Sequence, residues 1–254
     1  MGDKLFTRLV ASPCCNPKLS FDELMPAYVS MGFRKYEVFT TWVQSAFDID
    51  TDPRVYLDKS REFGLTYASL HLPPVDDADE QTLHRAVQGA RFAAALGAPI
   101  VLYKAVSREA YIRTAGAFLD AIDDLAVTAV LQNQYRTPIS SLDDFREVLE
   151  GIGDSRMKTL LEVGHFHSAG VDWRQGYELL GDTIRLVHVK DKVGRQSVVF
   201  GTGEIDYPAL FAHMRDVGYA GDFVMEIEAG DKDNTFDMMR ESLAYLEESC
   251  EEYL

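Results

Sequence analysis

The segment "TLLEVGHFHSAG" (159–170) combines an apolar run with Glu162, His165 and His167. Carboxylates and imidazoles are ligands for divalent metal ions, and they are also common general acids and bases. This stretch is therefore a candidate for metal binding or proton transfer. A surface loop with incidental histidines has the same composition, so other parts of the chain must decide between the two interpretations.

Other short apolar runs of the sequence also end in polar or charged residues. Taken alone, each has an ordinary interpretation, because a single histidine is more often a packed core or rim residue than a ligand. Buried charges are unfavourable unless they are paired or metal-bound, so a convergence of many such residues indicates a functional site. We expect only one of Glu226 and Glu228 to face that site. The residues at the run ends are Glu37, His71, Tyr103, Lys104, Gln132, Asn133, Gln134, His188, Lys190, Asp191, Glu226 and Glu228.

The apolar runs have the length of buried parallel strands, and longer amphipathic segments separate them. Glycine marks several segment ends, for example at Gly97. Strands are predicted over 5–11, 35–40, 65–72, 98–104, 127–134, 158–164, 184–190 and 222–228. Helices are predicted over 21–31, 53–63, 79–96, 108–125, 142–151, 173–181, 207–217 and 235–248.

This alternation predicts an α/β fold, and the length favours a single (β/α)8 barrel, the TIM barrel, as one domain over residues 1–254. An open, doubly wound sheet is the alternative. It normally has a glycine-rich phosphate turn after its first strand, and "ASPCCNPKLS" (11–20) contains none. In a closed barrel the carboxyl ends of all strands meet at one face, which would bring the polar run ends together. The polar segment 191–206 is a candidate lid or substrate loop.

Composition narrows the range of partners. The net charge of −16 repels phosphate backbones and anionic membrane surfaces, so we expect neither nucleic acid nor a membrane as partner. No apolar stretch is long enough to cross a bilayer, and the N-terminus lacks the features of a signal peptide. Three cysteines, two of them adjacent (Cys14 and Cys15), fit no disulfide framework. We therefore expect a cytoplasmic protein with reduced thiols.

Three motifs in the second half of the chain carry a family resemblance. They are "EVGH" (162–165), "HVKD" (188–191) and "GTGEIDYPALFAHMRDVGYAGDFVMEIE" (201–228). Together they resemble the sugar phosphate isomerase/epimerase family, whose members are xylose isomerase-like TIM barrels distantly similar to endonuclease IV. "KYEVF" (35–39) and "SLHLPP" (69–74) match the earlier strands of that family more loosely.

The resemblance implies a divalent metal ion, such as Mn, Mg, Co or Zn, held by side chains of the fifth to eighth strands. The positions that match the family's ligands are Gln132, Glu162, His188 and Glu226. Glu226 is also an expected catalytic residue, together with His165 beside the metal and Lys190 in the same cavity. The expected substrate-binding residues are Glu37, His71, Asn133 and Gln134.

Two positions depart from the family pattern. The fifth strand of the family usually carries Glu-Asn-His, whereas this chain has "QNQ" at 132–134. Gln132 offers a neutral oxygen and no base, so metal affinity should fall and a two-base epimerisation is in doubt. The sixth-strand acid is usually aspartate, and the longer Glu162 would reposition the ion.

The resemblance implies a metal-dependent isomerase, epimerase or dehydratase that acts on a sugar, ketose or cyclic polyol. The metal would polarise a carbonyl group, and Glu226, His165 or Lys190 would take the neighbouring proton. The alternative is an altered barrel of the same family that binds a ligand or serves as a non-catalytic subunit. A small-molecule sugar or polyol is the expected partner, and a homo-oligomer is an open expectation. The acidic balance argues against a metal-dependent nuclease.

Overall fold

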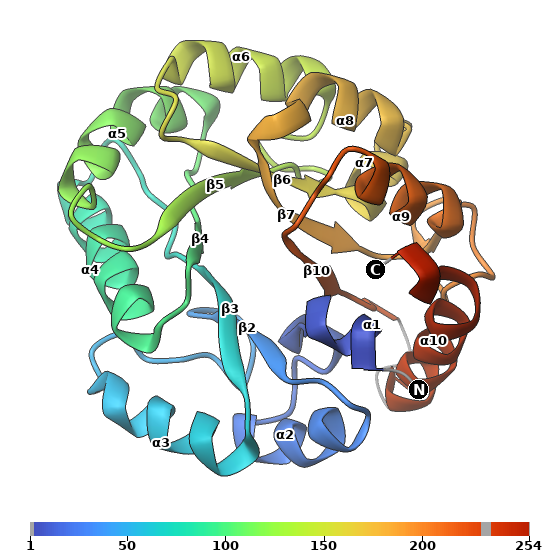
Figure 1. Cartoon of the computed structure of the whole chain (residues 1–254). Coiled ribbons are helices and arrows are strands. Elements are labelled where there is room, and N and C mark those ends of the chain that lie inside the picture. Colours follow the sequence, from blue (N-terminus) through green and yellow to red (C-terminus); the bar gives the residue numbers. More distant parts are fainter. Residues whose placement is uncertain (1–2, 230–234, 254) are drawn as a thin grey trace.

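The computed structural model of the protein describes residues 3–229 and 235–253. Eight parallel strands close into a barrel in the order β1-β10-β7-β6-β5-β4-β3-β2, as predicted (Figure 1). β1 closes the barrel because it pairs with both β10 and β2. The strands are β1 (Leu9–Ala11), β2 (Lys35–Phe39), β3 (Thr66–His71), β4 (Ile100–Leu102), β5 (Thr128–Gln132), β6 (Lys158–Glu162), β7 (Ile184–Val189) and β10 (Asp222–Met225).

Helices surround the barrel and alternate with its strands (Figure 1). Local sequence sets their ends: Ser20 and Glu23 form a capping box at the start of α2, and Gly64 and Gly97 end α3 and α4 in the left-handed conformation. The α-helices are α1 (Asp3–Arg8), α2 (Phe21–Ser30), α3 (Pro53–Phe63), α4 (Glu80–Leu96), α5 (Arg108–Ala121), α6 (Leu142–Ile152), α7 (Val163–Ser168), α8 (Trp173–Leu180), α9 (Tyr207–Asp216) and α10 (Thr235–Cys250). Three short 3-10 helices are η1 (Pro13–Cys15), η2 (Gly181–Thr183) and η3 (Glu251–Tyr253).

The first predicted strand, 5–11, was wrong over its first half. Residues up to Arg8 belong to α1, and β1 begins at Leu9. The guanidinium group of Arg8 donates hydrogen bonds to the carbonyl oxygens of Tyr219 (2.9 Å) and Gly221 (2.6 Å), just before β10. These contacts fix the end of α1 against the barrel, which only the tertiary structure could supply.

The sixth predicted strand, 158–164, ends two residues early. α7 begins directly after Glu162, which is the N-cap of this helix. The Glu162 carboxylate accepts hydrogen bonds from the backbone N–H groups of Gly164 and His165. His167 therefore lies on a helix, and its Nε2 is 2.8 Å from Glu204 Oε2. The segment "TLLEVGHFHSAG" is a strand followed at once by a helix.

The barrel interior is filled by a layer of apolar side chains that is separate from the core between strands and helices. Its members are Val10, Ala68, Leu102, Val130, Leu160, Leu186 and Val224. Successive side chains of a strand point to opposite faces, so the residue two positions onward faces inward again. On every one of these strands except β3, whose pairing with β2 is irregular, that residue is polar: Ser12, Lys104, Gln132, Glu162, His188 and Glu226.

The polar segment 191–206 contains a small hairpin, β8 (Lys192–Val193) and β9 (Gln196–Ser197). Asp191 anchors it, because its carboxylate accepts hydrogen bonds from the backbone N–H groups of Gly201 (2.9 Å) and Gly203 (3.0 Å). The loop that follows β7 is thereby fixed at its base. Among the described residues, no helix is both long enough and apolar enough to cross a membrane.

Candidate active site

His188 lies at the centre of the polar layer and is fully buried. Its Nε2 is 3.1 Å from Glu37 Oε1, while its Nδ1 faces Glu162 Oε2 at 3.5 Å and Glu226 Oε1 at 3.6 Å. Burial would lower the pKa of His188, but the carboxylates of Glu37 and Glu226 raise it well above its ordinary value. The structure thus brings two of the other three predicted metal ligands, Glu162 and Glu226, to the imidazole of His188.

Glu37 on β2 is held by four neighbours. Its carboxylate accepts hydrogen bonds from Ser69 (2.9 Å) and Ser12 (3.1 Å), and it lies 3.1 Å from Nε2 of both His71 and His188. Burial opposes its charge, yet the two histidines lower the pKa of Glu37 well below its usual range. Glu37 therefore orients the two imidazoles, and with all these contacts it has little capacity left for substrate.

His71 stacks on Phe39, with ring centroids 3.8 Å apart. Burial, and after it the charge of Lys104, lower the pKa of His71 to about 4, so its imidazole is neutral at pH 7. The predicted substrate-binding pair Glu37 and His71 is therefore a linked, buried unit beside the cluster.

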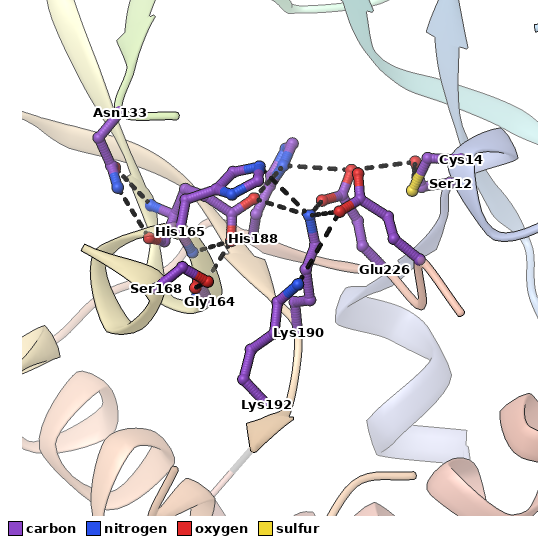
Figure 2. A network of polar contacts seen from close by, with 12 residues as sticks. Ser12, Cys14, Asn133, Gly164, His165, Ser168, His188, Lys190, Lys192 and Glu226 are labelled. Carbon is purple, nitrogen blue, oxygen red and sulfur yellow. Dashed lines mark hydrogen bonds and ion pairs between the residues drawn. The ribbon is translucent and has the colours of Figure 1, made fainter. Parts of the chain in front are cut away.

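Lys190 is fully buried and joins the carboxylates of the site (Figure 2). Its Nζ lies 2.8 Å from Glu226 Oε2, 3.0 Å from Glu228 Oε2 and 3.6 Å from Glu162 Oε2. Burial opposes its charge, but the surrounding carboxylates raise the pKa of Lys190 well above its ordinary value. The expectation that only one of Glu226 and Glu228 faces the site was wrong, because residues i and i+2 share one face of an extended chain.

His165, on the first turn of α7, is the fourth neighbour of Lys190, with 3.4 Å between Nε2 and Nζ. Burial and the nearby ammonium lower the pKa of His165 to about 2. The imidazole is therefore neutral, and its Nε2 accepts from Lys190 while Nδ1 carries the proton. Figure 2 shows this ring beside His188 and Lys190.

The three polar residues at the end of β5 have different surroundings. Asn133 is clamped to the next strand: its amide donates to the carbonyl oxygen of Glu162 (2.9 Å), and its side-chain oxygen accepts from the Glu162 N–H (3.0 Å). This places Asn133 behind the site as a positioning residue for Glu162. Gln132 is buried at the inner face, and its side chain has no polar partner among the described residues. The backbone of Gln134 bonds to Ile139, within the loop before α6.

Two inward-facing residues near the site were missed by sequence reasoning. Ser12 Oγ lies within hydrogen-bonding distance of Glu226 Oε1 (3.3 Å) as well as Glu37. Cys14 Sγ lies 3.3 Å from the same hydroxyl, and burial raises the pKa of its thiol well above the ordinary value. The two-residue period from Val10 to Ser12 could have identified Ser12, whereas Cys14 lies in η1, where that period does not apply.

The side chains of Glu162, His188 and Glu226 fit a divalent metal ion. Each offers a ligand atom within 4.8 Å of the others, and all three residues are buried. Glu162 Oε2 and His188 Nδ1 are buried atoms without a hydrogen-bond partner among the described residues. Burial raises the pKa of Glu162, and the charge of Lys190 offsets only part of this effect. An oxygen, nitrogen and oxygen donor set with unsatisfied atoms is suited to such an ion.

The family model described as the xylose isomerase-like TIM barrel matches residues 26–249. The chain belongs to this family. No curated protein matches the chain in sequence. The closed barrel of this chain agrees with the fold named in the family's description.

Solved structures share the fold over nearly the whole length. The IOLI protein with a binding zinc atom superposes with a TM-score of 0.80 at 12% identity, over 97% of this chain and 99% of that chain. An L-ribulose 3-epimerase gives a TM-score of 0.76 at 19% identity, over 97% and 95%. The probable 3-DHS dehydratase AsbF from Bacillus anthracis gives 0.77 at 16% identity, over 94% and 98%. At these identities the similarity shows the fold alone.

Proposed function

We propose that this protein is a metal-dependent enzyme that removes a proton next to the carbonyl group of a sugar or polyol. The observation that carries the proposal is the setting of His188. Its Nε2 is held by Glu37 at 3.1 Å, and its Nδ1 faces two further carboxylates, Glu162 and Glu226. A carboxylate on the far ring nitrogen fixes the tautomer that a metal-binding histidine needs.

Glu162, His188 and Glu226 would hold the ion, and Gln132 stays the predicted fourth ligand. The metal would polarise the substrate carbonyl and so acidify the adjacent C–H bond. Of the solved structures with the same fold, one contains zinc and another is a complex with magnesium. Both ions are divalent, which supports a divalent ion here but does not identify the metal. Glu37 would keep the imidazole oriented, and Asn133 would do the same for the backbone of Glu162.

Glu226 and Lys190 are suited to move the protons. Burial opposes the charge of Glu226, but Lys190 and His188 lower its pKa well below the ordinary value, so it is a carboxylate and can act as base. Despite burial, the surrounding carboxylates raise the pKa of Lys190, so it would be an ammonium ion and would serve as the acid rather than as the base. Once Lys190 has given its proton to a leaving group, the 2.8 Å contact between Glu226 Oε2 and Lys190 Nζ would let the proton taken by the carboxylate pass to the resulting amine.

These roles favour β-elimination of water over epimerisation. Glu226 would take the α-proton, the electron pair would form the double bond, and the β-hydroxyl would leave with a proton from Lys190. Epimerisation would need a second base on the opposite face of the substrate. At that position the family has a fifth-strand acid, and this chain has Gln132 instead. Isomerisation on one face, with Glu226 both taking and returning the proton, is compatible with the same residues. The fold neighbours include both a probable dehydratase and an epimerase.

Metal content and proton exchange test the proposal together. Protein purified without chelator should retain a divalent ion or bind added Mn, and it should exchange a carbon-bound proton of a ketose or inosose for solvent deuterium, detected by NMR. Glu162→Gln should weaken metal binding, whereas Glu178→Gln, on the exposed face of α8, should not. A protein that neither retains nor binds a divalent ion would contradict the proposal.

One observation favours the non-catalytic alternative. The Lys190 ammonium already lies between Glu226 and Glu162, so it partly neutralises the site without any metal. A barrel that binds a sugar tightly but shows neither metal binding nor deuterium exchange would match that alternative. The cytoplasmic location and a homo-oligomeric state remain predictions from the sequence.

A further inference from the structure

Lys104 lies two residues after the end of β4, three strands away from β7 and Lys190 in the order of the barrel. Leu102, two residues earlier, belongs to the apolar layer inside the barrel. Tyr103 points the other way, since its hydroxyl lies 2.7 Å from Thr114 Oγ1 on α5. The alternation therefore returns Lys104 to the inside, and its charge acts on His71 of the neighbouring strand β3.

The ammonium group of Lys104 has no hydrogen bond or ion pair with any part of the chain that the structure describes. The contrast with Lys190 is sharp, because Lys190 contacts Glu226 and Glu228 at 3.0 Å or less. Burial lowers the pKa of Lys104, and the distant carboxylates of Glu37 and Glu226 offset only part of this effect. Lys104 is partly exposed, so an anion can reach its unpaired ammonium and offset the cost of its partial burial.

Gln132 is the neighbour of Lys104 on the adjacent strand. Leu102 pairs with Val130, and both Lys104 and Gln132 lie two residues beyond that pair. Neighbouring strands are about 4.8 Å apart, so the two residues lie next to each other on the inner face of the barrel. Gln132 as a whole is 8% exposed, and its side chain also has no polar partner within the described residues.

The identity of residue 132 decides what Lys104 can bind. A glutamate there would form an ion pair with Lys104 and neutralise it. Glutamine leaves the ammonium unpaired and adds N–H donors of its own. The other nearby carboxylates are occupied: Glu37 accepts from Ser69 and contacts His71 and His188, and Glu226 contacts Lys190.

We propose that Lys104 and Gln132 form a subsite for an anionic substituent, a carboxylate or a phosphate, on the substrate. This inference rests on the proposed function, because it assigns the substrate class of the same cavity. The ammonium provides the charge, and the amide provides a neutral donor that does not repel the anion. The carbonyl end of the substrate would lie toward His188 and the anionic end toward β4 and β5.

Isothermal titration with matched six-carbon ketoses tests the subsite. The probes are D-fructose, D-fructose-6-phosphate and 5-ketogluconate, which are neutral, phosphorylated and carboxylated. One anionic probe should bind about tenfold or more tightly than fructose, and its identity separates phosphate from carboxylate. Lys104→Met should abolish this preference. Lys158→Met is the control, because Lys158 lies at the start of β6, at the end of that strand away from Glu162. This variant should keep the preference for the anionic probe.

Gln132→Glu is the second variant, because it retains Lys104 but gives it an ion-pair partner. It should also bring the anionic probes down to the affinity of fructose. Equal binding of all three probes to the wild type, or the absence of any binding, would overturn the proposal, and so would a preference that survives both substitutions. Metal content is measured on the same preparations. Retained metal without anion preference refutes only the subsite, and anion preference without metal refutes only the proposed function.

Discussion

Replacing Lys190 by methionine is the most direct test of how the site is held together. Lys190→Met removes the charge and keeps much of the side-chain volume. It leaves Glu226 and Glu162, both buried, and the partly exposed Glu228 without their common cation. We expect a clear loss of stability, together with a rise in divalent metal affinity, since the ammonium no longer competes for the carboxylates.

The distances set the size of the effect. With an effective dielectric constant of about 20, Coulomb's law gives roughly 5 kcal/mol of attraction for each close contact before desolvation. Desolvation consumes much of this, and breaking a buried ion pair from one side costs about 3–5 kcal/mol. For a chain of this size that corresponds to a fall in Tm of roughly 6–20 °C.

Thermal melts in the presence of EDTA, followed by circular dichroism, measure the loss. Lys59→Met is the matched control, because Lys59 contacts Asp22 at 2.6 Å where both side chains are substantially exposed. Its removal should cost about 1 kcal/mol or less. Mn at about a hundredfold excess over its Kd should return roughly 2.7 kcal/mol to the Lys190 variant. If that variant melts with the wild type in EDTA, the ion-pair cluster does not stabilise the fold, and our reasoning fails.

Three further predictions concern other parts of the site. Gly203→Ala should destabilise the protein by about 1–3 kcal/mol in urea unfolding, because a Cβ there overlaps the Asp191 carboxylate, whereas Gly116→Ala, in open space on α5, should stabilise it by roughly 0.5–1 kcal/mol. The folded state holds the pKa of His165 at about 2, against about 6.5 in the unfolded chain, so stability should fall as the pH drops below about 6.5. His165→Asn should flatten that dependence by up to about 1.4 kcal/mol per pH unit, and an unchanged slope would contradict the assignment of a neutral imidazole. Gln132→Glu should raise Mn affinity in a calorimetric titration, and unaltered affinity would place residue 132 away from the ion.

The sequence by itself determined the barrel and the residues that meet at its mouth. Strand-length apolar runs alternate with amphipathic helices, and parallel strands that close into a barrel must bring their carboxyl ends to one face. Glu162, His188 and Glu226 could therefore be placed together from their positions at run ends. The two-residue period of a strand also predicts the inward direction of Ser12 and Lys104.

Only the tertiary structure decided which side chains of the site contact one another. Glu37 reaches His188 because closure sets β2 across the interior from β7, and no local pattern encodes that distance. Lys190 gained three carboxylate partners in the same way, and these raise its pKa well above the ordinary value. The clamp of Asn133 on the Glu162 backbone depends on strand register. Local periodicity fixes which face a side chain occupies, whereas its partners and protonation state depend on groups brought near by chain closure.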